Sequence, residues 1–282
     1  MKKIILLCAV VIITACTGSR DNLSEAKNAY FLHDYSRALD FFSAALRRDS
    51  GSPDLAAECH NYMAKIHFLQ RNKTDFYRQF DLFRAGYSTR LENRAVKKTL
   101  SMYYFFSSVF LEKLENQKSA YEDLVKAVTM QPDNPFALHR LGYFFLIKNN
   151  TAKYLEVSKL IVNPGHLTLD EQEMLNQLAL LNQLYHALHD GRDSAAEELI
   201  LVSKNQPARF RFFPADYELL EAYCAAWKGK ASGAIDIFRK YYTNSGIIRS
   251  ALQFELTANP FILNIQSSDD YQIFFDTFFK QE

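Results

Sequence analysis

Apolar residues along most of the chain recur with offsets of four and then three positions. The sets are Ala38, Phe42 and Ala45; Phe76, Phe80 and Phe83; Ala120, Leu124 and Ala127; Ala196, Ile200 and Ser203; and Ala234, Phe238 and Tyr241. Residues with these offsets lie on one face of an α-helix. The pattern predicts a series of helices that each bury one face. With only 9 glycines and 7 prolines, the chain has too few turn formers for an all-β fold of this length.

A second set of mostly small residues precedes these helices by a fixed distance. Twelve positions before the first residue of each set stand Ala26, Ala64, Ser108, Leu184 and Ala222, and Gly142 stands twelve before Tyr154. Two antiparallel helices cross closely only where a small side chain lets the backbones approach. Pro132 cannot continue a helix, and the residues after it favour a turn. The spacing therefore predicts helical hairpins with small residues in their seams.

These offsets resemble the tetratricopeptide (TPR) repeat, whose unit is a 34-residue helix–turn–helix. Gly142 follows Ser108 by 34 residues, and Tyr154 follows Ala120 by 34. The resemblance implies an all-α, TPR-type helical-hairpin solenoid over residues 23–246, with about six helical pairs that stack on their neighbours. Phe76 and Leu184 stand where the repeat expects small residues. The anchors are 34 to 44 residues apart, so we expect an irregular array.

A carboxy-terminal segment, residues 247–282, follows the repeats. Its Pro260-Phe261 pair and the later phenylalanines resemble the tail that closes some bacterial TPR proteins. One helical face carries Phe274, Phe275, Phe278 and Phe279. We therefore expect a capping helix over the last repeat, with Ser267 and Asp270 forming its N-cap.

The amino terminus has the layout of a secretory signal, with two lysines, an apolar run and small residues over positions 1–15. The sequence Ile13-Thr14-Ala15-Cys16 resembles the bacterial lipobox, which implies that Cys16 carries acyl chains such as palmitate. Residues 16–22 would form a short tether. The alternatives are an ordinary signal with cleavage nearby, or a retained anchor. Thr17 in place of aspartate favours the outer membrane, on its periplasmic or surface face.

The charge and cysteine content narrow the class of protein. The 282 residues carry a formal charge of +1, which argues against a nucleic-acid binder. Cys59 and Cys224 lie in apolar helical stretches, so we expect two buried thiols. A disulfide between them is the alternative in an oxidising compartment.

Recognised catalytic motifs are missing from the sequence, which contains no phosphate-binding loop, dinucleotide fingerprint, zinc-protease motif or nucleophile elbow. His186, His189 and Asp190 have metal-ligand spacing, but their place before Gly191 predicts an exposed helix end. We expect His60 and His67 to flank core positions. The sequence therefore predicts no enzyme, no cofactor and no metal.

The TPR resemblance implies that the first helix of each hairpin lines an inner groove. The residues expected there are Phe105, Phe136, His139, Tyr143, Leu181, Tyr185, Leu219, Tyr223 and Trp227. Most are apolar, and a tyrosine recurs in the last three hairpins. We expect a groove for a hydrophobic ligand, an apolar segment of a partner protein, or a second copy of the chain. In the alternative, tight closure or the carboxy-terminal segment fills this groove as core.

Together these patterns predict a non-catalytic, lipid-anchored TPR scaffold in the bacterial cell envelope. One version is an adaptor in outer-membrane protein assembly, as the TPR lipoprotein of the barrel-assembly machinery is. The other is a component of a periplasmic ligand-uptake system, resembling spirochaetal TPR lipoproteins. The apolar groove slightly favours the second version.

Overall fold

The computed structural model describes residues 22–49, 51–112, 117–148, 150–162, 167–206, 212–245 and 260–279. Within these ranges the chain is made of helices and the turns between them, with no strand. The predicted signal, Cys16 and nearly all of the tether lie outside the described residues. None of the described helices has both the length and the apolar character needed to span a bilayer.

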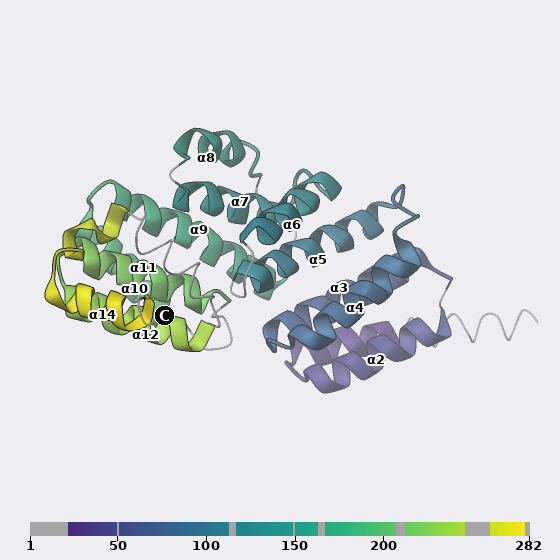
Figure 1. Ribbon diagram of the computed structural model, residues 1–282. Helices are drawn as coiled ribbons and strands as arrows, with labels where there is room; N and C mark the ends of the chain where they lie inside the picture. The colour runs from purple at the N-terminus through teal and green to yellow at the C-terminus, as the bar shows by residue number, and fades with distance from the viewer. Residues whose placement is uncertain are drawn as a thin grey trace, which may run out of the picture. The chain divides into compact units, whose positions relative to one another are not determined.

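The helices follow one another as hairpins (Figure 1). The first helix, at residues 22–31, pairs with α2. The further helices are α2 (Tyr35–Arg48), α3 (Pro53–Leu69), α4 (Lys73–Tyr87), α5 (Arg94–Glu112), α6 (Gln117–Met130), α7 (Pro135–Ile147), α8 (Thr151–Ser158), α9 (Leu169–His189), α10 (Asp193–Lys204), α11 (Pro214–Trp227) and α12 (Ala231–Ser245). A 3-10 helix, η2 (Pro260–Ile265), and α14 (Asp269–Phe279) end the described chain.

The chain divides into two compact units. Unit 1 comprises Met1–Ser107 and Lys126–Pro132, and unit 2 comprises Ser108–Val125 and Asp133–Glu282. Helices α5 and α6 each contribute residues to both units.

One turn recurs between the two helices of the hairpins. The residue two positions before the second helix has a positive φ in four of them: His33 (60°), Arg71 (57°), Gly191 (66°) and Gly229 (70°). The next residue donates its backbone N–H to a carbonyl five residues earlier, as in Asp34 N to Ala29 O at 2.9 Å and Lys230 N to Ala225 O at 2.9 Å. This is the Schellman motif, which satisfies the last carbonyls of the first helix. Its recurrence shows that the hairpins repeat one local structure.

Short polar side chains cap the start of several of the second helices. Asp34, Asn72 and Asn150 each accept a hydrogen bond from the backbone N–H three residues on, at 3.2, 3.1 and 3.2 Å. Such N-caps satisfy donors that the helix leaves unpaired. Asn134 caps α7 in the same way, accepting from the N–H groups of Phe136 and Ala137. The chain therefore reverses direction where its sequence supplies both a C-cap and an N-cap.

The predicted seams are confirmed: Ala38, Ala120 and Ala234 have no exposed surface. Ala64 and Phe76 are also fully buried. Phe76, which deviates from the repeat, is therefore buried like the small residues at the other anchors. Where one helix offers a large side chain, the residue twelve positions away is small.

The carboxy-terminal elements pack on the last hairpin, η2 against α11 and α14 against α12. Phe274 of α14 is fully buried. The helix is capped by Ser268, whose Oγ accepts from Tyr271 N at 3.3 Å and donates to Ile265 O at 2.7 Å. The prediction that Ser267 forms the cap is therefore wrong by one residue, because η2 extends to Ile265 and delays the start of α14. Phe278 and Phe279 have side chains outside the described set.

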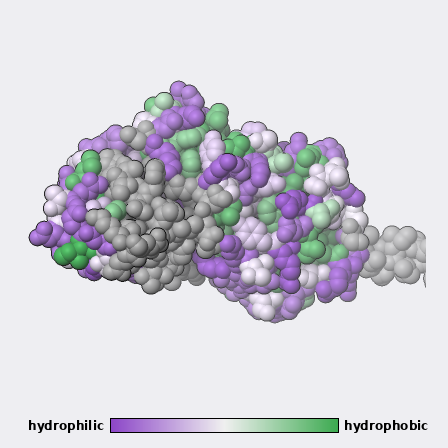
Figure 2. Space-filling model, viewed as in Figure 1, coloured by the Kyte–Doolittle hydropathy of each residue, from purple (hydrophilic) through white to green (hydrophobic). Residues whose placement is uncertain are grey.

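Buried thiols and histidines lie where the sequence predicted them. Cys59 and Cys224 are both buried and free, so no disulfide joins them. His60 and His67 are both buried in α3. On the described face shown in Figure 2, hydrophilic and hydrophobic residues are interspersed.

Candidate functional site

The residues predicted to line an open groove are mostly inaccessible to solvent. Phe105, Phe136, Tyr143, Leu181, Tyr185 and Tyr223 are buried, whereas His139, Leu219 and Trp227 are partly exposed. This burial matches the alternative in which the groove is filled as core, because these side chains already pack against other parts of the chain. Whether they also bind a partner stays a prediction.

Phe261 of η2 fills the part of the groove formed by α9 and α11. Its ring centroid lies 5.4 Å from that of Tyr185, 5.9 Å from Tyr223 and 6.1 Å from Trp227. These are ordinary separations for packed aromatic rings. Asn264 Nδ2 donates to Trp227 O at 2.7 Å, which fixes η2 at the end of α11. The carboxy-terminal segment thus occupies positions expected to be open.

A buried ion pair closes the part of the groove formed by α7 and α11. Arg140 Nη2 lies 3.0 Å from Asp216 Oδ1, and both side chains are nearly inaccessible. The guanidinium also lies over the Tyr143 ring at 5.1 Å and the Phe213 ring at 5.6 Å. Because α7 and α11 belong to hairpins separated by another hairpin, this pair spans the groove instead of a seam.

His139 lies in the same region, and its own side chain is neutral. Burial lowers the pKa of its imidazole to about 4. Its Nδ1 lies 3.3 Å from Asn182 Nδ2, which also donates to the His139 carbonyl. An imidazole held neutral next to an amide is suited to packing and hydrogen bonding at neutral pH, and less suited to binding an anion.

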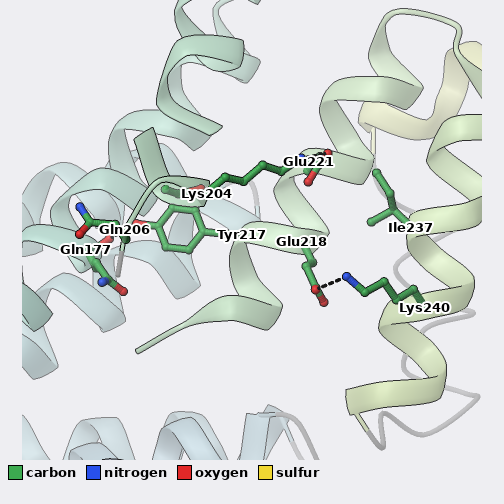
Figure 3. Close-up of a pocket in the computed structure, with 9 residues that line it drawn as sticks. Gln177, Lys204, Gln206, Tyr217, Glu218, Glu221, Ile237 and Lys240 are labelled. Carbon is green, nitrogen blue, oxygen red and sulfur yellow. Dashed lines mark hydrogen bonds and ion pairs between the residues drawn. The ribbon is translucent and has the colours of Figure 1, made fainter. Parts of the chain in front are cut away.

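A pocket of about 370 Å³ opens among α9, α10, α11 and α12 in unit 2 (Figure 3). It is lined by Gln177, Ser203, Lys204, Gln206, Tyr217, Glu218, Glu221, Ile237 and Lys240. Glu218 and Glu221 lie one helical turn apart on α11, and each pairs with a lysine of a different neighbouring helix. Lys240 Nζ is 2.8 Å from Glu218 Oε1, and Lys204 Nζ is 2.5 Å from Glu221 Oε1.

Hydrogen bonds fix the inner wall of this polar pocket. Tyr217 donates its hydroxyl to Gln177 O at 2.8 Å, and Phe212 N donates to Gln177 Oε1 at 3.0 Å. Burial, with nearby acidic residues, raises the pKa of Tyr217, so its hydroxyl remains protonated. The hydrogen bond that Lys240 donates to Glu218 raises the pKa of Lys240, so this ammonium remains charged. The pocket therefore presents stable charges and polar groups to solvent.

These groups are better suited to binding than to chemistry. The Ser203 hydroxyl donates to Ile200 O at 2.7 Å. Within the described ranges no group of three His, Cys, Asp or Glu side chains could hold a metal. His189 lies 3.5 Å from Asp190 Oδ1 at an exposed helix end, as expected. Sequence reasoning missed this pocket, because its residues come from four helices and share no motif.

Comparisons with known proteins add little to this geometry. No family model matches the chain, and no curated protein matches it. Among solved structures, a tetratricopeptide repeat protein from Parabacteroides merdae is similar, with 12% sequence identity and a TM-score of 0.45 over 86% of this chain and 98% of that chain. The repeated turns, caps and seams, rather than this likeness, show an all-α fold of TPR-type helical hairpins.

Proposed function

We propose that the chain is a non-catalytic scaffold of the bacterial cell envelope that binds a partner protein and is anchored by lipid at Cys16. The observation that carries the proposal is the way unit 2 binds its own segments. Phe261 lies among three aromatic side chains of the repeats, and Phe213 lies against Arg140. The helical hairpins therefore form surfaces whose chemistry suits segments of protein chain.

The polar pocket is the part of unit 2 where such a partner would find accessible charged groups. Lys204 and Lys240 are 55% and 61% exposed in their side chains, and their glutamates are about half as exposed. Ion pairs with this exposure contribute about 0–1 kcal/mol each. Exchanging one of them for a charged side chain of a partner therefore costs little.

The filled groove favours the adaptor over the ligand-uptake component. An apolar small molecule would need the space that Phe261 and Arg140 occupy, whereas a partner protein can use the pocket without displacing them. An exposed pocket with two ammonium groups and two carboxylates is also a poor site for an apolar ligand. This reverses the slight preference that the sequence alone gave to ligand uptake.

The test is site-specific photo-crosslinking in cells, with a photoreactive amino acid at Ile237 in the pocket. The control position is Leu82, which is exposed on α4. We expect Ile237 to capture an envelope protein that Leu82 does not capture. Replacing both Glu218 and Glu221 with lysine should abolish that product, whereas replacing Asp81, which forms an exposed ion pair with Arg84, should not.

Two results would count against the scaffold. One is an unchanged set of crosslinked proteins after the charge reversal. The other is a tightly bound small molecule in the purified protein with no protein captured in cells, which would favour ligand uptake.

A further inference from the structure

The aromatic socket, defined as Tyr185, Tyr223 and Trp227, is filled by a segment from outside the six hairpins. In this socket Phe261 is 2% exposed. The other apolar residues of η2 differ in exposure: Ile262 and Ile265 are buried, and Leu263 is 59% exposed. The occupant is therefore a short segment that inserts one aromatic and two aliphatic side chains and keeps its other side in solvent.

The segment is a short element that packs on α11 through buried side chains. Its backbone forms a single short 3-10 helix of six residues, whose hydrogen bonds have poorer geometry than those of an α-helix. One described side-chain hydrogen bond, from Asn264 to Trp227 O, links it to the end of α11. These six residues belong to none of the hairpin helices, so another segment could replace them without unwinding a hairpin helix.

The tyrosine of the fourth hairpin is covered by a residue of the hairpins themselves, whereas the aromatic socket is filled by the carboxy-terminal segment. Tyr143 stands at the same repeat position as Tyr185 and Tyr223, but Arg140 of its own helix covers it. The Arg140–Asp216 pair joins α7 directly to α11. That part of the groove cannot open without breaking a buried ion pair. The aromatic socket differs, because its occupant Phe261 comes from η2, which lies outside the hairpins.

We propose that the aromatic socket is a docking site for a partner segment that carries a phenylalanine followed by aliphatic residues, and that η2 is its intramolecular competitor. This inference rests on the proposed function and names the partner's chemistry. The partner segment would present a ring to Tyr185, Tyr223 and Trp227, as Phe261 does. It would also donate a hydrogen bond to Trp227 O, as Asn264 does.

Competition of this kind has a measurable consequence. A ligand that binds only the open form has its apparent affinity reduced by the fraction of molecules that are open. Removing the Phe261 ring should raise that fraction, and so raise the apparent affinity for an added segment without changing the socket. We expect an increase of at least tenfold.

The experiment uses the full-length protein and a fluorescein-labelled peptide of residues 260–266, followed by fluorescence anisotropy. We expect weak binding to the unmodified chain and at least tenfold tighter binding to the Phe261→Ala variant. The same peptide with its phenylalanine replaced by alanine should bind neither. The control variant is Phe274→Ala, which removes a buried ring of α14 outside the socket and should not improve peptide binding.

A second variant covers the case in which Phe261→Ala is poorly folded. Asn264→Ala removes the hydrogen bond to Trp227 O, keeps every ring, and should tighten peptide binding by a few fold. The proposal is overturned if both variants keep their helical circular dichroism and bind no more tightly than the unmodified chain. It is also overturned if Phe261→Ala loses its helical structure and Asn264→Ala binds no more tightly, because Phe261 is then core. If peptide binding fails, the crosslinking at Ile237 can still support the proposed scaffold. If no partner is crosslinked, neither the scaffold nor this docking site is supported.

Discussion

At the scale of single residues, Gly142 shows why size at fixed positions governs this fold. A Cβ at this position would come within 3.3 Å of the Tyr154 ring. Glycine inside a helix costs about 0.5–1 kcal/mol relative to alanine. The chain therefore accepts a poor helix former in α7 because a large ring from α8 takes the space.

We expect Gly142→Leu to lower the free energy of unfolding by about 1–3 kcal/mol, because the added side chain overpacks the seam. Adding Tyr154→Ala should recover part of the loss, since the ring that clashes is then gone. Urea denaturation followed by circular dichroism measures both effects. The control is Gly233→Ala in α12, where nothing lies within 4 Å, and where we expect a gain of about 0.5–1 kcal/mol. Equal losses for Gly142→Leu with and without Tyr154 would contradict the seam contact.

The buried histidines give the protein a stability that depends on pH. Burial lowers the pKa of His60 to about 4 from its ordinary value of 6.5. Between these two values the unfolded chain binds a proton that the folded chain does not, so stability falls as pH decreases from about 6.5 to about 4. At about 1.4 kcal/mol per pKa unit, this amounts to about 2 kcal/mol between pH 7 and pH 5.

We therefore expect His60→Leu to weaken the loss of stability between pH 7 and pH 5, measured as the difference in urea unfolding free energy. The exposed His189, replaced in the same way, serves as the matched control and should leave the pH dependence as it is. If both variants lose the same stability as the unmodified chain on acidification, the His60 imidazole is not held neutral by burial.

At the scale of elements, the Arg140–Asp216 pair couples α7 to α11. Removing one partner of a buried ion pair leaves an uncompensated charge, which costs about 3–5 kcal/mol. We expect Asp216→Ala to destabilise unit 2 by this amount in denaturant unfolding. Asp81→Ala, which breaks an exposed pair with Arg84 at 2.9 Å, should cost less than about 1 kcal/mol.

The double variant Arg140→Met with Asp216→Leu removes both charges and should recover most of the stability lost by Asp216→Ala, because no buried charge is left unpaired. If Asp216→Ala costs no more than Asp81→Ala, water reaches the Arg140 guanidinium, and the groove is more open than the structure shows.

The elements also show how far sequence reasoning reaches. Hairpins, seams and buried thiols could be predicted because they depend on residues twelve positions apart or fewer. The pairing of a small Ala64 with a large Phe76 twelve positions later is also local in the sequence. Closure of the groove could not be predicted, since Arg140 and Asp216 are 76 residues apart and nothing in either local sequence specifies the other. The polar pocket depends on four helices and was missed for the same reason.

The aromatic positions illustrate this limit most clearly. The sequence predicted Tyr185, Tyr223 and Trp227 as neighbours on one surface, and all three contact one ring. It also associated Phe261 with closing the array. It left open whether the surface faces a partner or the chain itself, because a phenylalanine from either source satisfies the same aromatic contacts.

At the scale of the whole molecule, the tether determines how far from a membrane the helical hairpins can lie. The first described helix begins at residue 22. The six residues that follow Cys16 in the tether span at most about 20 Å when fully extended. Lipidation at Cys16 would therefore hold unit 1 close to the bilayer surface. Partners would then be envelope proteins within reach of a membrane-bound scaffold.

We expect Cys16→Ser to move the protein from the membrane fraction to the soluble fraction of bacterial cells. Each buried CH2 of an acyl chain contributes about 0.8 kcal/mol, so several chains hold a protein firmly and their loss releases it. Growth with a clickable palmitate analogue should label the unmodified chain and not the variant. Cys224→Ser is the matched control, because that buried thiol should affect neither labelling nor fractionation. A membrane-bound, unlabelled chain would instead indicate a retained apolar anchor, and a soluble, unlabelled chain would indicate an ordinary cleaved signal. Either result removes the lipid from the proposal and leaves the scaffold to be judged by its partner alone.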